Sequence, residues 1–270
     1  MEDEDNELDT AAYLSPSVTH YRRSAFYPAE EEDYKTTSFY SSVYTQPQIA
    51  VYPKTEKQWK IKGGKGYLFV KRSFDIFVSF LMIVLLSPLL LFLLLGVKLS
   101  SKGPAIFKDK RVGKNGKTIY VYKFRSMYID AESRLHEYLT PEQYEEWKRD
   151  RKIKNDPRIT KFGKFIRKTS LDELPQLFNI LNGTMSIVGP RPIAQYELDE
   201  NYTEEEKRVF LSAKPGLFSN WAVNGRSNVT YEGHKRQDLE LSYFEKRSIW
   251  FDLKLMFMVI PAVLGHKGAQ

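Results

Sequence analysis

One apolar segment dominates the pattern of hydrophobic and polar positions, because residues 76–97 carry no charge. A straight helix of these 22 residues would be about 33 Å long, enough to cross a hydrocarbon core of about 30 Å. Pro88 interrupts the segment, since it offers no donor to the carbonyl of Val84 and clashes with it. The sequence therefore predicts a helix kinked at Ser87-Pro88, in which the Ser87 hydroxyl bonds part of the freed backbone.

The two flanks of this segment are equally basic. Residues 54–72 and residues 98–117 each contain seven Lys or Arg side chains. Basic flanks prefer the cytoplasmic face, and here neither end has the advantage. A helix that enters the membrane, bends and returns would keep both flanks on one face, with arms of roughly 16 Å each. The residues alone leave a spanning and a re-entrant helix open as alternatives.

Beyond residue 100, short periodic segments alternate with turns. The pattern predicts strands at 105–107, 118–122 and 185–188, and helices at 130–151 (broken at Thr140-Pro141), 161–168, 174–181 and 195–213. The basic helix at 161–168 has an apolar face and is expected at the membrane surface. The apolar stretch 255–264 is too short to span and is expected to be interfacial or packed. We therefore expect a mostly helical α+β fold.

Charge is unevenly distributed along a chain whose net charge is +7. Residues 1–33 hold ten acids and two bases, a net −8, so residues 34–270 carry +15. A body this basic is expected to bind an anionic partner, such as nucleic acid, an anionic membrane surface or a phosphorylated substrate. The chain has no cysteine, which excludes disulfides, thiol catalysis and thiolate metal sites.

The first 65 residues form an acidic, Tyr-rich segment without helical or strand periodicity. Seven tyrosines lie between residues 13 and 52. This composition is typical of a disordered tail. A solvated extension is the ordinary interpretation, and the alternative is a regulatory arm that binds a partner or is phosphorylated by a tyrosine kinase.

Two adjacent carboxylates, Asp172 and Glu173, lie where a helix is expected to begin. Ser170 followed by Glu173 matches a capping box, or else Asp172 is the cap and Pro175 occupies the third helical position. Either arrangement puts the pair in a first turn, which attracts anions. The pair is then a simple helix cap, or an ionised Asp nucleophile for phosphorus beside a ligand for a divalent cation.

Four arginines stand in or beside turns or strand ends: Arg125, Arg158, Arg191 and Arg226. One such arginine is ordinarily part of a surface ion pair. Four of them, together with a carboxylate pair and a membrane segment, indicate a phosphate-handling cleft at a bilayer surface. The expected substrates are a nucleotide diphosphate from the cytosol and a lipid phosphate from the membrane.

The ordered set of motifs over residues 67–265 resembles the bacterial sugar transferases, the monotopic polyprenol-phosphate (undecaprenyl-phosphate) sugar phosphotransferases. The matching motifs are Lys71-Arg72-x-x-Asp75, Ser87-Pro88, Gly103-Pro104-x-x-Phe107, Arg111-Val112-Gly113, Lys123-Phe124-Arg125-Ser126-Met127, Asp156-Pro157-Arg158-Ile159-Thr160, Thr169 to Gln176, Ser186 to Pro192, Lys214-Pro215-Gly216 and Tyr243-Phe244-Glu245. The chain departs from the larger members in having the Tyr-rich tail where they have a transmembrane bundle. It also has Phe244 where Val is common.

The resemblance implies a ping-pong phosphoglycosyl transfer. Asp172 would attack the sugar-linked phosphate of a UDP-sugar and release UMP, and Glu173 would help to hold Mg²⁺. The sugar phosphate would then pass to polyprenol phosphate, the first membrane step of exopolysaccharide, capsule or glycoconjugate synthesis. The expected parts are a tail (1–65), a re-entrant membrane helix (66–100) and a membrane-surface catalytic domain (101–270), monotopic on the cytoplasmic face of a bacterial cell membrane.

The resemblance also guides the choice of site residues. The expected set is Pro190, Arg191 and Pro192 for the nucleotide, Lys123, Arg125, Arg158 and Arg226 for phosphate, Asp238 and Gln176 as polar partners, Ser87 and Pro88 at the helix break, and Lys71 and Arg72 as membrane-interface anchors. A homo-oligomer is a further expected partner. The main rival is a non-catalytic, membrane-anchored adaptor for anionic lipids. Nucleic acid is not expected, because no nucleic-acid-binding signature accompanies the charge, and no Asp-x-Asp motif at a strand end supports a phosphatase.

Overall fold

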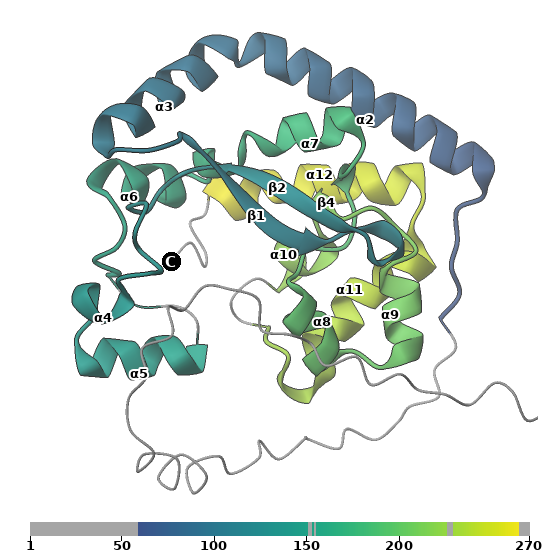
Figure 1. Cartoon of the computed structure of the whole chain (residues 1–270). Helices are drawn as coiled ribbons and strands as arrows, with labels where there is room; N and C mark the ends of the chain where they lie inside the picture. The colour runs from purple at the N-terminus through teal and green to yellow at the C-terminus, as the bar shows by residue number, and fades with distance from the viewer. Residues whose placement is uncertain (1–58, 151–152, 154, 226–228, 265–270) are drawn as a thin grey trace, which may run out of the picture. The chain divides into compact units, whose positions relative to one another are not determined.

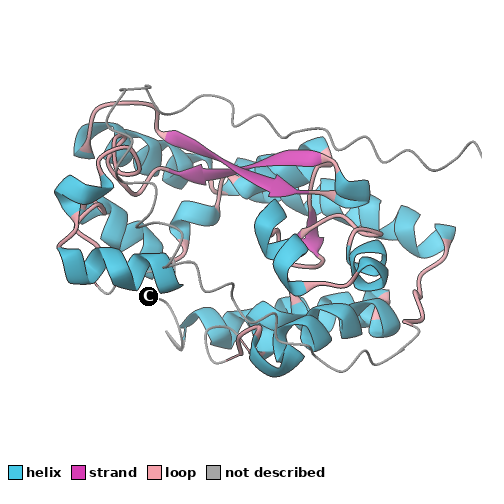
Figure 2. Ribbon diagram, turned by 60° about the horizontal axis from the view of Figure 1, so that its bottom comes forward, coloured by secondary structure: helices cyan, strands magenta, loops and turns pink. Residues whose placement is uncertain are grey.

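A computed structural model describes residues 59–150, 153, 155–225 and 229–264 of the chain. These residues belong to one compact unit, residues 52–270. Most of the predicted tail lies outside the described residues, as does Arg226. The described part is mostly helical with a few short strands, which confirms the α+β class (Figures 1 and 2).

The elements follow one another along the chain in this order. The first are α2 (Lys65–Leu85), α3 (Ser87–Ser100), β1 (Ile106–Val112) and β2 (Thr118–Phe124). The central ones are α4 (Leu135–Tyr138), α5 (Pro141–Asp150), α6 (Lys161–Lys168), α7 (Gln176–Asn182) and β3 (Ser186–Val188). The last are α8 (Gln195–Asn201), α9 (Glu204–Phe210), β4 (Gly216–Phe218), α10 (Asn220–Asn224), α11 (Lys235–Lys246) and α12 (Ile249–Leu264). Single 3-10 turns cover Lys114–Gly116, Leu171–Glu173 and Glu232–His234.

The predicted kink is present between α2 and α3, whose axes differ by 67° across Leu86. Ser87 Oγ donates to the carbonyl of Val84 at 2.8 Å, the acceptor that Pro88 cannot serve. Within the described ranges, no single helix is long and apolar enough to span a membrane, whereas the bent pair reaches that length and composition together.

Polar side chains near the start of α2 bind three elements that come later in the chain. Lys71 Nζ lies 2.8 Å from Asp252 of α12. Arg72 donates to two carbonyls at the C-terminal end of α7, where a cation is favourable. Asp75, only 3% exposed, accepts the backbone N–H of Ile187 in β3 at 3.0 Å. The motif that contains these three residues therefore joins α2 to α12, α7 and β3, and Figure 1 shows α7 beside α2.

Two predicted element boundaries are wrong. The hairpin strands β1 and β2 extend over seven residues each, because charged side chains occupy their exposed positions and disguise the strand period. The helix predicted at 195–213 is two helices, α8 and α9. Thr203 begins α9 with a capping box: its hydroxyl accepts from the Glu206 N–H at 3.3 Å, and the Glu206 carboxylate accepts from the Thr203 N–H at 2.9 Å.

Two hydrophobic cores support the region between the hairpin and α7. The larger core contains Val121 of β2, Ile180 of α7 and Phe244 of α11, all fully buried. The smaller one joins Leu93 of α3 to Ile166 of α6 and to the end of β2. β1 pairs antiparallel with β2, and β3 pairs in parallel with β4. The 3-10 turn at Leu171–Glu173 lies against both α6 and β2, and is thus held at the junction of the two cores.

Candidate active site

The Asp172-Glu173 pair lies in a 3-10 turn that precedes α7. Ser170 has a left-handed backbone (φ 56°), its N–H closes α6 on the carbonyl of Arg167, and its side chain makes no capping bond. The N-cap of α7 is Pro175. Both capping predictions, by Ser170 and by Asp172, are therefore wrong, because Ser170 precedes the 3-10 turn without a side-chain capping bond and Asp172 lies inside that turn.

The 3-10 geometry separates the acidic side chains from their apolar neighbours. Three residues complete one turn, so Leu171 and Leu174 lie on the same side of it. Both leucines pack against the smaller core, which includes α3 and α6. Glu173 lines a pocket between the hairpin and the start of α7, and Asp172 interacts electrostatically with Lys123 of that pocket.

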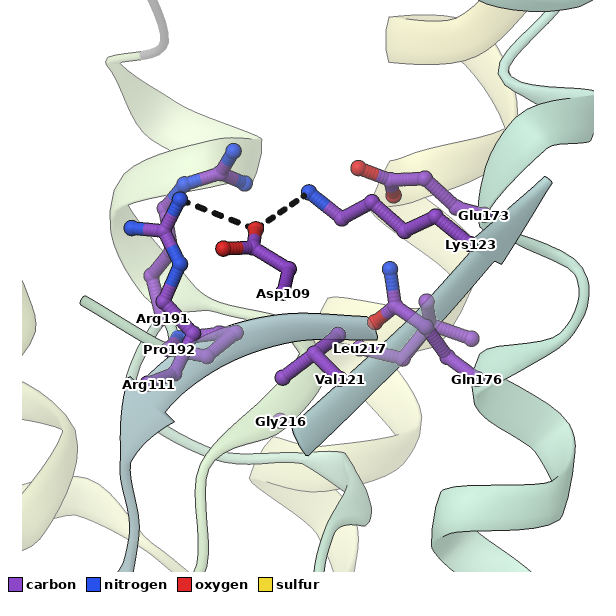
Figure 3. Close-up of a pocket in the computed structure, with 10 residues that line it drawn as sticks. All are labelled: Asp109, Arg111, Val121, Lys123, Glu173, Gln176, Arg191, Pro192, Gly216 and Leu217. Atoms are coloured by element: carbon purple, nitrogen blue, oxygen red, sulfur yellow. Dashed lines mark ion pairs between the residues drawn. The ribbon is translucent and has the colours of Figure 1, made fainter. Parts of the chain in front are cut away.

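The pocket collects side chains from five separate segments (Figure 3). Its lining residues are Asp109, Arg111, Val121, Lys123, Glu173, Gln176, Arg191, Pro192, Gly216 and Leu217. The sequence placed Lys123, Glu173, Gln176, Arg191 and Pro192 in the site, and the structure brings these five together. The polar character of this lining and its three cations suit an anionic, phosphate-bearing ligand.

Burial, together with the adjacent charge of Glu173, raises the pKa of the Asp172 carboxyl to about 6. Lys123 and Arg167 act in the opposite direction but do not prevail. Asp172 is nevertheless mostly ionised at neutral pH, because a pKa of about 6 lies below 7.

The loop that carries Arg191 is fixed by its backbone. The N–H of Gly216 donates to the carbonyl of Pro190 at 2.8 Å, and an added Cβ at Gly216 would lie 2.1 Å from the Gly189 nitrogen. Only glycine allows this approach of β4 to the loop. The Arg191 guanidinium carbon lies 5.3 Å from the ring centre of Trp221, a cation–π contact.

Glu240 of α11 supports the same loop from beneath. Its carboxylate accepts the Arg191 N–H at 3.3 Å and the Ser219 hydroxyl at 3.1 Å, and the side chain is 1% exposed. Burial raises the pKa of Glu240 to about 7, although Arg236, Ser219 and Arg191 oppose the shift. Nothing in the sequence pattern distinguished Glu240 from the other acids of this helix.

Two predicted phosphate ligands have other partners. Arg125, 6% exposed, donates to the carbonyls of Ser101 and Lys102 at 2.7 and 2.6 Å and so fixes the end of α3. Arg158, 4% exposed, is bound to Asp156, with its Nη2 2.6 Å from a carboxylate oxygen. Neither lines the pocket.

Other predicted residues lie elsewhere. The Asp238 side chain is 61% exposed beside His234, away from the pocket lining. Lys71 and Arg72, predicted as interface anchors, contact α12 and α7. Arg226 lies outside the described residues.

Two of the charged pocket residues were not predicted as site residues. Asp109 and Arg111 of β1 share one face of the hairpin with Lys123, because side chains alternate along a strand and the register pairs Phe107 with Lys123. A predicted strand as long as the observed one would have placed both residues on the Lys123 face, but the predicted strand ended at Phe107. Among the residues with described positions, no group of three or more His, Cys, Asp or Glu side chains could hold a metal ion.

The chain matches the family described as "Bacterial sugar transferase" over residues 66–266. The chain belongs to the bacterial sugar transferase family. The resemblance inferred from the motifs is thereby confirmed, and the matched range contains every residue that lines the pocket.

Named relatives show how this bacterial sugar transferase compares with known proteins of different length. It is 45% identical to an undecaprenyl-phosphate galactose phosphotransferase of Salmonella typhimurium over 74% of this chain and 42% of the relative. It is 41% identical to a UDP-glucose:undecaprenyl-phosphate glucose-1-phosphate transferase of Escherichia coli, over 74% and 41%. It is 39% identical to the exopolysaccharide production protein ExoY of Rhizobium meliloti, over 74% and 87%. The chain thus spans under half the length of the first two and most of the third.

Proposed function

We propose that this protein transfers a sugar 1-phosphate from a UDP-sugar to polyprenol phosphate, giving polyprenol diphosphate-sugar and UMP. The observation that carries the proposal is the Asp172-Glu173 turn beside a pocket that contains Arg111, Lys123 and Arg191. Family membership and the names of the two phosphotransferase relatives support the same reaction class. The name of the ExoY relative supports a role in exopolysaccharide synthesis.

The first half-reaction would use Asp172 as the nucleophile. Its carboxylate oxygen attacks the phosphorus that bears the sugar, and the bond from that phosphorus to the bridging oxygen breaks. UMP leaves with the bridging oxygen, and the sugar phosphate stays on Asp172. Lys123 and Arg191 would stabilise the charge that moves to the leaving group, because both lie in the pocket.

The second half-reaction would restore the carboxylate. A phosphate oxygen of the polyprenol carrier attacks the same phosphorus, and the bond to Asp172 breaks. UMP in the first half and the Asp172 carboxylate in the second are both good leaving groups, so the protein need supply no proton in either half.

Mg²⁺ is the cofactor we propose for this site. Mg²⁺ in proteins typically binds one or two carboxylates together with substrate phosphates and water. Glu173, which lines the pocket next to Asp172, fits the protein part of that ligand set. The ion would neutralise charge on the diphosphate.

We also propose that α2 and α3 enter the cytoplasmic leaflet and return, so that the protein is monotopic. Large apolar side chains are exposed along both arms, including Phe69 at 74%, Phe77 at 66%, Phe92 at 60% and Leu99 at 88%. The 67° bend and the basic residues at both ends are consistent with a shallow insertion. Helix α6, with an exposed Phe165 among lysines, would lie at the same interface.

Release of UMP tests the reaction. Purified protein is incubated with Mg²⁺, a panel of UDP-sugars and polyprenol phosphate, and UMP is measured. Asp172→Asn should abolish UMP release even without the lipid acceptor, since no covalent intermediate can form. Asp199→Asn makes the same chemical change on the exposed surface of α8 and should stay active. An Asp172→Asn protein that still forms the phosphosugar adduct would refute the nucleophile, and absence of UMP with every sugar would favour the adaptor function.

Labelling tests the membrane arrangement. The chain has no cysteine, so single substitutions at two exposed positions, Lys65→Cys at the start of α2 and Lys102→Cys just after α3, report the face of each end. A membrane-impermeant thiol reagent should label both from the cytoplasmic side. Leu86→Cys at the bend should be protected by lipid. Labelling of positions 65 and 102 from opposite faces would contradict the re-entrant helix.

A further inference from the structure

Asp109 occupies the middle of the pocket, between two of its cations (Figure 3). Its Oδ2 atom lies 2.9 Å from Nη2 of Arg111 and 3.3 Å from Nζ of Lys123. One carboxylate oxygen therefore meets both cations, an arrangement that a phosphate oxygen also adopts. The Asp109 side chain is 16% exposed, so the contact is reachable from solvent and not sealed in a core.

We propose that Asp109 is an internal substitute for the substrate's diphosphate. In the unliganded protein it holds the phosphate-binding cations, and it is displaced from them when the sugar nucleotide binds. This inference rests on the proposed function, because it assigns Arg111 and Lys123 to the diphosphate of that substrate. It makes Asp109 a residue that sets nucleotide affinity, without a part in the chemical step.

The size of the pocket supports a displacement. As the structure stands, the cavity has a volume of about 30 Å³, room for roughly one water molecule. Pockets for ligands of nucleotide size typically have volumes of about 300–1,000 Å³. The two ion pairs of Asp109 cross this space, so a diphosphate reaches Arg111 and Lys123 only when these ion pairs open.

Arg111 is built to exchange one of its partners. Its Nη1 atom lies 3.1 Å from Glu197 of α8, whereas its Nη2 atom holds Asp109. Glu197 does not line the pocket and can keep the guanidinium oriented after Asp109 leaves. The guanidinium fork thus has one end fixed to the protein and one end that a phosphate can take.

The competition has a cost in affinity and a benefit in turnover. A carboxylate close to the bound phosphates repels them and reclaims the cations once the ligand departs. Removal of the Asp109 charge is expected to change the dissociation constant of the diphosphate about tenfold, as is common for a partly exposed charge pair. Product UMP, which carries one phosphate, would be released more readily for the same reason.

The test compares anion binding by the wild-type protein, Asp109→Asn, Asp109→Glu and the surface control Asp199→Asn. The probes are UDP, inorganic pyrophosphate and uridine, with dissociation constants measured by calorimetry in one detergent buffer. Thermal unfolding checks that each variant is folded. Where UMP is produced, KM for the UDP-sugar and kcat are measured separately.

Asp109→Asn is expected to bind UDP and pyrophosphate about tenfold more tightly and uridine as the wild type does, and to lower KM without raising kcat. Asp109→Glu keeps a competing carboxylate and should bind close to the wild type, as should Asp199→Asn. Unchanged or weaker pyrophosphate binding by a folded Asp109→Asn protein would overturn the proposal and make Asp109 a brace. Tighter pyrophosphate binding without any UMP production would support this inference while refuting the proposed reaction.

Discussion

Five cations in or near the candidate site form two groups that differ in the partners they bind. Arg111, Lys123 and Arg191 line the pocket, and their partners are side chains: two ion pairs with Asp109 and a contact with the Trp221 ring. Arg125 and Arg158 are nearly fully buried, and they bind backbone carbonyls and Asp156. The first group can exchange its partners for a ligand, whereas the second cannot without breaking the fold. Whether an arginine of this protein can bind a ligand thus depends on the partner that it already holds.

The largest expected effect is on the buried group. Arg158→Met leaves the Asp156 carboxylate buried without its cation, which is expected to cost about 3–5 kcal/mol of unfolding free energy. Thermal or denaturant unfolding in detergent measures this loss. The double variant Asp156→Asn with Arg158→Met should recover part of the stability, because no uncompensated charge remains. A stable Arg158→Met protein with lost activity would move Arg158 into the substrate group.

The pocket group should respond in the opposite way. Arg191→Met removes a pocket cation but leaves the backbone contacts of its loop, so kcat/KM should fall about 100-fold while the melting temperature hardly changes. Steady-state kinetics of UMP release and thermal unfolding test this pair of outcomes. Arg208→Met, a change outside the pocket lining, is the matched control. A large loss of stability in Arg191→Met would erase the distinction between the two groups.

The last expected effect is a pH dependence of stability. It arises because Lys123 and Arg167 do not offset the effect of burial on the Asp172 carboxyl. The folded pKa of Asp172, about 6, exceeds its ordinary value of 3.8, so the folded state favours the protonated carboxyl. The contribution of Asp172 to stability is therefore fully present below about pH 4, falls by up to about 3 kcal/mol as the pH rises to about 6, and is then level. Over the same range kcat/KM should rise with pH as the nucleophile ionises.

Unfolding of the wild type and of Asp172→Asn at pH 4 to 8 measures this contribution. Asp172→Asn should lack the loss between pH 4 and 6 and be the more stable protein at pH 7. Equal pH dependence of the two proteins would mean that Lys123 and Arg167 hold the pKa at its ordinary value after all.

The sequence predicted the parts of the site that local chemistry defines. Pro88 dictates a bend, and Ser87 supplies the replacement donor; both follow from adjacent residues. The motif resemblance brought Lys123, Glu173 and Arg191 into one pocket, as the structure does. These residues are recognisable because each belongs to a short, continuous sequence motif.

The parts that failed depend on contacts between distant segments. Arg125 looks like a phosphate ligand, but carbonyls at the end of α3 take its donors. Asp109 was not predicted because its place on the same face as Lys123 depends on the register of the hairpin. In each case the deciding partner lies outside the local sequence pattern.

The packing of Leu171 and Leu174 against α3 bears on how freely this protein could be re-engineered. Leu93 and Val97 of α3, both fully buried, form part of the floor beneath the Asp172-Glu173 turn. In the proposed membrane arrangement, a chimera in which a foreign hydrophobic anchor replaces this helix would still reach lipid, but the Asp172-Glu173 turn would rest on a mismatched surface. We therefore expect such a chimera to be bound to lipid but inactive.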